Sequence, residues 1–435
     1  MANAEEQQCP NRGLVTSLPG NPDWDLGSAP RCLLWTGMLS FARSTPIPQP
    51  AQDDLLGETM HIVRLLALIA ATHLGAATLA AQDTIKIGAD LPMSGPNSEY
   101  GELFGAAANL AAEHANADKA LSKKLVIQFE DSQATPQQGV VAMTKLVNVE
   151  KVPFVLSAFT GVSKAIAPVG DKAKVVSVNG GGIGPDLAEL GDYFWNVIPL
   201  VNLEIRVMAP YLVQERGFKR IAHIYVDDPA GEAVQKELKE NVPKAGGQMV
   251  LELQVPRAAQ QFTSVAAKVR ESTPDLVFIS SFGAQQAQIV KQLRDNGVPQ
   301  QLASYSAFSS PTVTQLPEAK GALFPSQSVD WTAAGMSARV AKDWKAKTGK
   351  EPNAYVANYY NAVMVFVRLA QALEKSGQPI TGENLLKQRR ANGTFDLVGG
   401  KMEFLPNGSV SMPIQINEVD GGGGGKLIKA GTMAK

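Results

Sequence analysis

Short apolar runs alternate with helix-like segments along most of the chain. The first series of predicted strands covers residues 84–89, 124–129, 153–157, 174–178 and 194–198. Segments with helical spacing or an alanine-rich composition separate these runs, at residues 101–117, from 136, from 163 and at 202–215. Strands that alternate with helices predict a parallel sheet with helices on both of its faces.

The same alternation starts again after residue 219. Predicted strands cover residues 220–226, 248–255, 275–280 and 301–305, and predicted helices cover 231–244, 262–271 and 285–296. Two such series in one chain predict an α/β protein with two doubly wound lobes. The last third differs, with helices at 338–348 and 358–375, strands at 401–404 and 410–417, and a glycine-rich surface turn at 421–425.

A tail of this kind can cross back and complete both lobes. We therefore expect residues 82–200 and about 330–400 to form the first lobe. Residues 201–329 and about 401–435 then form the second lobe. Hinges are expected near residues 199–200 and 329–330, where the chain passes from one series to the other.

The first 59 residues show no sustained period, and they hold both cysteines and many prolines. We interpret residues 1–59 as a non-domain extension that arises from an over-called gene start. Residues 60–81 then read as a signal peptide that directs export to the periplasm, with Arg64, the apolar run 65–71 and the small residues 76–81 as its three regions. The alternative is a buried N-terminal helix.

Composition is that of an ordinary globular protein. The chain has 435 residues, of which 45% are hydrophobic and 19% charged, enough for two to three domains by the usual size of about 150 residues each. Its net charge of -1 provides no strong field toward nucleic acid or a membrane surface, so we expect neither as a partner. Removal of residues 1–81 leaves no cysteine, which excludes thiol chemistry and disulfides.

Motifs of catalysis and cofactor binding are missing from the sequence after residue 81. Its two histidines, His114 and His223, are not at a metal-ligand spacing, and there is no G-x-S-x-G or Walker A motif. Residues 180–185 (GGGIGP) resemble a dinucleotide loop, but Pro185 occupies the position of its last glycine. We expect no metal, no cofactor, no catalytic residue and no enzymatic activity.

Polar, aromatic and glycine residues recur where the predicted strands end. In α/β sheets, ligands bind beyond the carboxyl ends of the strands. The candidate ligand-binding residues are Ser94, Tyr100, Thr160, Gly161, Asn179, Gly181 and Gly182 in the first series and Asp228, Phe282, Tyr305 and Ser306 in the second. Any one of them is explained equally well by ordinary loop polarity, but their recurrence at successive strand ends predicts a site for a small polar ligand.

Several motifs also resemble those of a known family. They are IKIG, LPMSGP and YG within residues 85–101, FTGV, AIAP and GPDL within 159–187, and DLVF with QLR within 275–294. On these motifs, residues 84–417 resemble the periplasmic substrate-binding proteins of ABC transporters in the branched-chain amino acid (leucine/isoleucine/valine) class. The resemblance implies a monomer of the type I periplasmic binding fold that closes two lobes on a small-molecule ligand and delivers it to membrane permease and ATPase subunits.

Roles in the site follow from the same resemblance. It implies that Tyr100 borders the pocket, that the Thr160 hydroxyl binds a ligand carboxylate, and that the backbone of Gly181 and Gly182 meets the ligand's carboxylate and amine. It also implies that Phe282 is an aromatic residue of the second lobe that faces the pocket.

Three positions depart from the family pattern. Ile183 replaces a frequent threonine, Ala230 replaces an aromatic residue, and Ser306 replaces the acid that pairs the α-ammonium. Because a buried ammonium without a carboxylate partner loses its compensation for desolvation, we expect a carboxylate without an α-ammonium, or a small amide. Asp227 or Asp228 could substitute for the acid. A ligand-sensing module of a receptor and a secreted α/β enzyme are the alternative functions.

Overall fold

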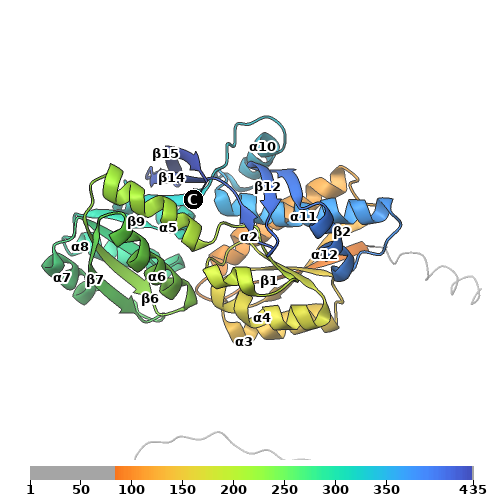
Figure 1. The fold of residues 1–435 in the computed structure, drawn as a ribbon, viewed down its shortest axis with the longest axis horizontal. Coiled ribbons are helices and arrows are strands. Elements are labelled where there is room, and N and C mark those ends of the chain that lie inside the picture. The colour runs from red at the N-terminus through yellow and green to blue at the C-terminus, as the bar shows by residue number, and fades with distance from the viewer. Residues whose placement is uncertain (1–83, 434–435) are drawn as a thin grey trace, which may run out of the picture. The chain divides into compact units, whose positions relative to one another are not determined.

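The structure, a computed structural model, describes residues 84–433 (Figure 1). The expected extension at 1–59 and the signal peptide at 60–81 lie outside the described residues. The described residues belong to one compact unit, which contains two large sheets and one small sheet. No helix among them is long and apolar enough to cross a membrane.

The first lobe is built on a five-stranded parallel sheet with the order β2-β1-β3-β4-β5. Its central strands are buried at every residue, as expected for a parallel sheet covered on both faces. Helices α2 and α11 pack together on one face, and α3 and α4 pack on the other. The strands are β1 (Thr84–Leu91), β2 (Lys124–Asp131), β3 (Phe154–Ser157), β4 (Val176–Asn179) and β5 (Phe194–Asn196), and the helices are α2 (Ser98–Ala117), α3 (Pro136–Asn148), α4 (Thr160–Ala173), α11 (Ala354–Lys375) and α12 (Gly382–Ala391).

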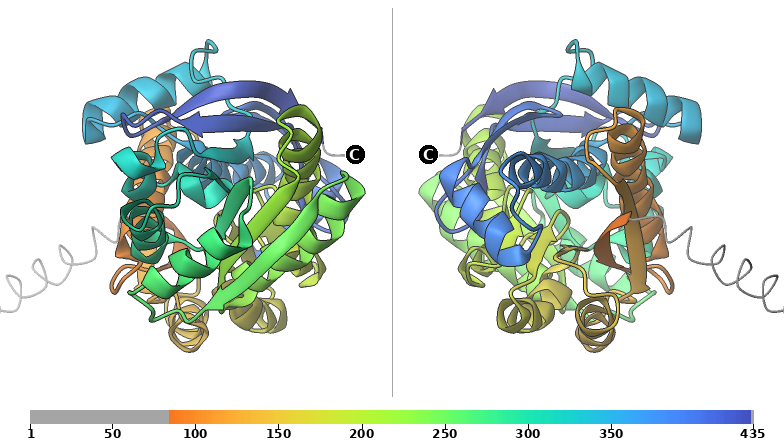
Figure 2. Two further views of the ribbon diagram at one scale, coloured as in Figure 1. Left: turned by 90° about the vertical axis from the view of Figure 1, so that its left-hand side faces the viewer. Right: turned by 90° about the vertical axis from the view of Figure 1, so that its right-hand side faces the viewer.

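The second lobe is built on a seven-stranded sheet with the order β15-β14-β10-β9-β8-β6-β7. Five strands are parallel, and β14 and β15 form an antiparallel pair along one edge (Figure 2). The strands are β6 (Arg220–Val226), β7 (Gln248–Val255), β8 (Leu276–Ser280), β9 (Gln301–Ser304), β10 (Leu323–Gln327), β14 (Ile414–Val419) and β15 (Gly425–Thr432), and the helices are α5 (Val201–Pro210), α6 (Pro229–Lys244), α7 (Thr263–Ser272), α8 (Gly283–Asp295) and the short α9 (Pro311–Thr314).

The chain passes between the two sheets at three places: residues 197–200, 328–335 and 412–413. The first two coincide with the segments where we expect hinges. The third follows a small sheet of β11 (Thr394–Leu397), β12 (Gly400–Phe404) and β13 (Val410–Ser411). After the second passage, α10 (Met336–Thr348) packs against α2.

The position of the small sheet corrects our lobe boundary. We expected residues from about 401 onward in the second lobe, but the rings of Phe404 and Trp195 lie 5.9 Å apart and Asn196 N donates to Gly408 O at 2.9 Å. Residues 401–411 therefore pack on β5 of the first lobe. The chain joins the second sheet only from Ile414.

Parallel strands with intervening helices confirm the α/β fold class of the sequence prediction. Three strands were missed. β10 contains Pro325, a residue that argues against an interior strand, and β11 and β15 carry only weak apolar alternation. The glycine turn predicted at 421–425 connects β14 to β15, although Gly425 already pairs with Val419.

Candidate ligand-binding site

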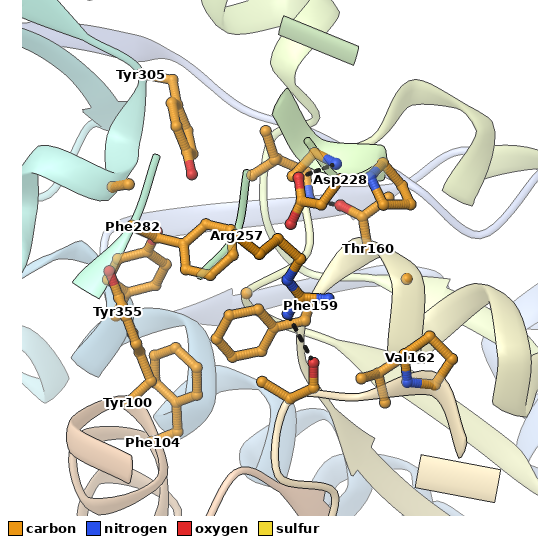
Figure 3. Close-up of a pocket in the computed structure, with 18 residues that line it drawn as sticks. Tyr100, Phe104, Phe159, Thr160, Val162, Asp228, Arg257, Phe282, Tyr305 and Tyr355 are labelled. Atoms are coloured by element: carbon orange, nitrogen blue, oxygen red, sulfur yellow. Dashed lines mark hydrogen bonds between the residues drawn. The ribbon is translucent and has the colours of Figure 1, made fainter. Parts of the chain in front are cut away.

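A cavity of about 50 Å³ lies between the two lobes, beyond the carboxyl ends of strands from both sheets (Figure 3). Seven of the eleven residues singled out in the sequence line it. These are Tyr100, Thr160, Gly161, Gly181, Asp228, Phe282 and Tyr305. The volume holds about three or four waters, so a ligand of amino-acid size enters only if the walls move apart.

Thr160 begins α4 directly after β3. Its side-chain oxygen accepts hydrogen bonds from Ile183 N at 3.1 Å and Gly184 N at 3.2 Å, and the residue is 2% exposed. Because a hydroxyl has two acceptor positions and one donor, its O–H is the capacity that remains for a ligand. The first-turn amides of α4 have no partners inside the helix, and the positive end of the helix dipole favours an anion here.

Phe159, the residue before α4, adopts a left-handed backbone conformation with φ of 63°. This conformation is uncommon for a residue with a side chain and is strained. It turns the chain sharply from β3 into α4, and the Phe159 ring lines the cavity. The strain is therefore located at the candidate site.

Asn179 holds the glycine loop that follows β4. Its Oδ1 accepts from Gly181 N at 3.2 Å and from Gly182 N at 2.6 Å, while its Nδ2 donates to Gly182 O and Asn196 Oδ1. A side chain on Gly181 would meet the Tyr359 hydroxyl at 2.9 Å, so glycine is required there by close packing. Asn179 and Gly182 thus support the cavity wall and do not line it.

Two other expected residues also lie outside the cavity lining. Ser94 is exposed, and its hydroxyl donates to Asp131 Oδ2 at 2.5 Å to close the loop after β1. Ser306 is buried, and its backbone N donates to Glu204 Oε2 at 3.1 Å. We predicted both residues at the site because they follow strand ends. In the structure they form local hydrogen bonds and do not line the cavity.

Aromatic side chains make up much of the cavity wall. The Phe159 ring stands nearly perpendicular to those of Tyr100 and Phe282, with centroids 5.6 Å and 5.3 Å away. Tyr355 lies edge-on to Tyr100 at 6.1 Å, and Phe104 packs beside both of them. The sequence prediction missed Phe104, Phe159 and Tyr355. Only Phe159 carried a signal, as the first residue of the FTGV motif.

Contacts between the lobes close the cavity. Tyr100 Oη accepts from Gly283 N at 3.1 Å, and the Arg257 guanidinium donates to Ala134 O at 3.2 Å. The ring contact between Phe159 and Phe282 also spans the two lobes. Arg257 lies two residues after the carboxyl end of β7, a predicted strand end from which we took no candidate. It is the single cation among the described residues that line the cavity.

Asp228 lines the cavity, but its carboxylate is already engaged. It caps α6 by accepting from Ala230 N at 2.9 Å and Gly231 N at 2.8 Å. Burial raises the pKa of Asp228 above its usual value, and these amides partly offset that effect. One of the two residues that we considered as substitutes for the missing acid is thus committed to a helix cap. The other, Asp227, accepts from Gln254 Nε2 at 2.9 Å and does not line the cavity.

A different acid, Glu204, lies where the sequence suggested that none was present. It is 1% exposed in the first turns of α5, with Oε2 bound to Ser306 N and Oε1 without a partner. Burial raises the pKa of Glu204 to about 7, while hydrogen bonding from Ser306 acts in the opposite direction. No strand-end rule points to a residue inside a helix, so the sequence prediction missed it.

His114 and His223, the two histidines among the described residues, each contact protein side chains. His114 lies between Tyr360 and Asp343, and His223 is fully buried with its Nε2 2.7 Å from Ser280 Oγ. Burial lowers the pKa of His223 to about 3. Within residues 84–433, no group of three or more histidine, cysteine or acidic residues is arranged to hold a metal ion.

Comparisons with known proteins agree with this architecture. Residues 84–425 match the periplasmic binding protein family. A Leu/Ile/Val-binding protein homolog 1 of Brucella abortus is 23% identical over 335 residues, which cover 76% of this chain and 88% of that protein.

Two solved structures share the fold. The leucine-binding protein LivK of Thermotoga maritima superposes with a TM-score of 0.72 at 20% identity, covering 80% of this chain and 99% of that one. An ABC-transporter solute-binding protein of Rhodopseudomonas palustris BisB5, in complex with 3,4-dihydroxybenzoic acid, gives 0.72 at 20% identity, with 81% and 98% covered.

Proteins of this family are periplasmic, non-enzymatic transport components that bind small molecules. The match extends over most of the described residues and includes both lobes. The chain therefore belongs to the periplasmic binding protein family.

Proposed function

We propose that this protein captures a small carboxylate that lacks an α-ammonium and has an aromatic or apolar body, and that it binds this ligand between its lobes and delivers it to the permease and ATPase subunits of an ABC importer. Within that role we propose that it acts as a monomer in the periplasm, after export through residues 60–81. The observation that carries the proposal is the Thr160 hydroxyl at the start of α4, beside an aromatic cavity.

The carboxylate end is supported by three kinds of donor. The Thr160 hydroxyl has its hydrogen left to donate, because its oxygen already accepts two backbone amides. The first-turn amides of α4 add unpaired N–H groups and a favourable dipole. Arg257, on the opposite lobe, contributes a positive charge to the lining.

Aromatic side chains of the protein favour a particular kind of ligand body. Six aromatic side chains surround the cavity: Tyr100, Phe104, Phe159, Phe282, Tyr305 and Tyr355. Perpendicular and offset ring pairs are favourable beyond their buried area, so these walls suit an aromatic or branched apolar group. The fold itself serves both classes, because one relative is named for Leu/Ile/Val and one neighbour holds 3,4-dihydroxybenzoic acid.

A thermal-shift screen of the purified protein tests the proposal. It compares benzoate, 4-hydroxybenzoate, leucine and 4-methyl-2-oxopentanoate, with a set of small amides, on the wild type and on Thr160→Val. A ligand that binds only the folded state raises the melting temperature. We expect a rise with at least one carboxylate that lacks an α-ammonium, and a smaller rise in Thr160→Val. A rise with leucine but not with its keto acid would contradict the proposal.

A further inference from the structure

Glu204 is a buried acid with an unused hydrogen-bonding position next to the cavity. It stands on α5, which follows the first passage of the chain between the lobes, and its Oε2 accepts from Ser306 N at 3.1 Å. Its Oε1 makes no hydrogen bond of ordinary geometry. Burial raises the pKa of Glu204, and the nearby Ser306 side chain acts in the opposite direction. No ion pair in the described part of the chain involves Glu204.

The acid lies directly behind the cavity wall. Ser306 stands between Tyr305 and Ala307, and both of these neighbours line the cavity. Tyr355 also lines it. Burial raises the pKa of both tyrosines, and the charge of Glu204 adds a smaller effect in the same direction, as expected for close groups. Because the cavity measures only about 50 Å³, a ligand enters only if its walls move apart, and Ser306 lies in the chain between two residues of that wall.

A buried carboxyl oxygen without a partner is unfavourable, so its presence in a native structure calls for an explanation. We propose that Glu204 is a specificity-determining residue of this site, whose free oxygen accepts a hydrogen bond from a hydroxyl group on an aromatic acid. This inference rests on the proposed function and narrows its substrate class to hydroxylated aromatic carboxylates.

The position of the polar groups within the ligand distinguishes a ring hydroxyl from an α-ammonium. In a free α-amino acid, the ammonium and the carboxylate are attached to the same carbon and need neighbouring partners. Figure 3 shows Thr160 on one side of the cavity and Tyr305 and Tyr355 on the other. A ligand whose carboxylate meets Thr160 therefore reaches Glu204 with its far end, where an aromatic acid carries a ring hydroxyl.

The test is a calorimetric comparison of 4-hydroxybenzoate and benzoate on the wild type and three variants. In Glu204→Gln an acceptor oxygen is retained, and in Glu204→Met it is removed. Glu99→Gln is the matched control, because burial also raises the pKa of Glu99 to about 7 and Glu99 does not line this cavity. If Glu204→Met fails to fold, the Gln variant carries the comparison.

We expect the wild type to bind 4-hydroxybenzoate at least tenfold more tightly than benzoate. The preference decreases in Glu204→Gln, disappears in Glu204→Met and is unchanged in Glu99→Gln, while benzoate affinity stays within threefold throughout. Equal wild-type affinities for the two acids would overturn the role of Glu204 and leave the proposed function intact. Failure of both acids to bind would count against the proposed function itself. If phenylalanine binds more tightly than phenylpyruvate and this preference is lost in Glu204→Met, the partner of Glu204 is an ammonium and not a hydroxyl. That result would overturn the proposal.

Discussion

Asn179 and Glu204 are two buried polar side chains beside the same cavity, and they differ in how completely they are hydrogen-bonded. Asn179 makes four hydrogen bonds within the glycine loop and to Asn196. Glu204 makes one to the Ser306 amide and has an oxygen to spare. The saturated side chain fixes the shape of the site, and the unsaturated one is free to distinguish ligands.

This difference predicts separate consequences for stability and for selectivity. A fully satisfied buried network is rigid, and its loss leaves several groups without partners. An acid with one unused oxygen contributes little to the empty protein, because its burial offsets its single hydrogen bond. The predictions below test that separation.

Asn179→Leu should have the largest effect on folding. The substitution leaves the amides of Gly181 and Gly182, and two acceptors, without partners inside the protein. We expect the free energy of unfolding to fall by roughly 3–5 kcal/mol, as for loss of a buried network. Guanidinium denaturation measures it. If the free energy of unfolding falls by less than about 1 kcal/mol, or falls equally in Glu204→Met, the two residues do not differ in their contribution to stability.

Glu204 makes stability depend on pH. Its pKa is about 7 in the folded protein and near 4.5 when exposed, so between these values the folded state keeps a proton that the unfolded state has released. Stability therefore falls as the pH rises through this window, by up to about 3 kcal/mol.

Denaturation curves from pH 4 to 8 on the wild type and Glu204→Gln measure this contribution as a difference. The difference matters because His223, with a pKa of about 3, acts in the opposite direction below pH 6.5. Stability of the wild type relative to the variant should decline across the window. Parallel profiles would show that Glu204 titrates normally and is not held in a dry environment.

Thr160→Val should weaken ligand binding by ten- to a hundredfold, which corresponds to about 1.5–3 kcal/mol for a hydrogen bond to a charged group. Thr160→Ser, which keeps the hydroxyl, is the matched control and should bind within a few-fold of the wild type. Calorimetry with benzoate measures both variants. Equal affinities of the Thr160→Val and Thr160→Ser variants would show that the hydroxyl does not contact the ligand.

Tyr100→Phe should have the smallest effect. It removes the hydroxyl that accepts from Gly283 N across the lobes, and a single such bond contributes about 0.5–1.5 kcal/mol to closure. We expect up to tenfold weaker binding, expressed as faster ligand release in stopped-flow experiments. An unchanged release rate would show that this contact does not hold the lobes together.

The sequence predicted the half of the candidate site that follows a local rule. Thr160 and Gly181 stand directly after strands, where parallel sheets present their ligands, and the structure places both at the cavity. Tyr355 and Glu204 come from helices α11 and α5, and their contacts with the cavity region depend on how the chain returns between the lobes. No local pattern encodes that return.

Hydrogen bonding explains the remaining differences. Ser94 and Asn179 are at the correct strand ends, but Asp131 and the glycine loop occupy their polar groups. Ser306 was read as the loss of an acid, and the structure shows that Glu204 approaches the same point from another element. A comparison along the sequence detects a missing residue type but not an acid that a different helix brings to the same region.

Small-angle scattering with and without ligand tests the central claim, that the ligand is held between the two lobes, most directly. The contacts of Tyr100 with Gly283 and of Arg257 with Ala134 describe a closed form, and a ligand can reach the cavity only when they open. We predict that the radius of gyration of the purified protein decreases when a carboxylate that binds by calorimetry is added to saturation. An unchanged radius at saturation would contradict closure of the lobes on the ligand.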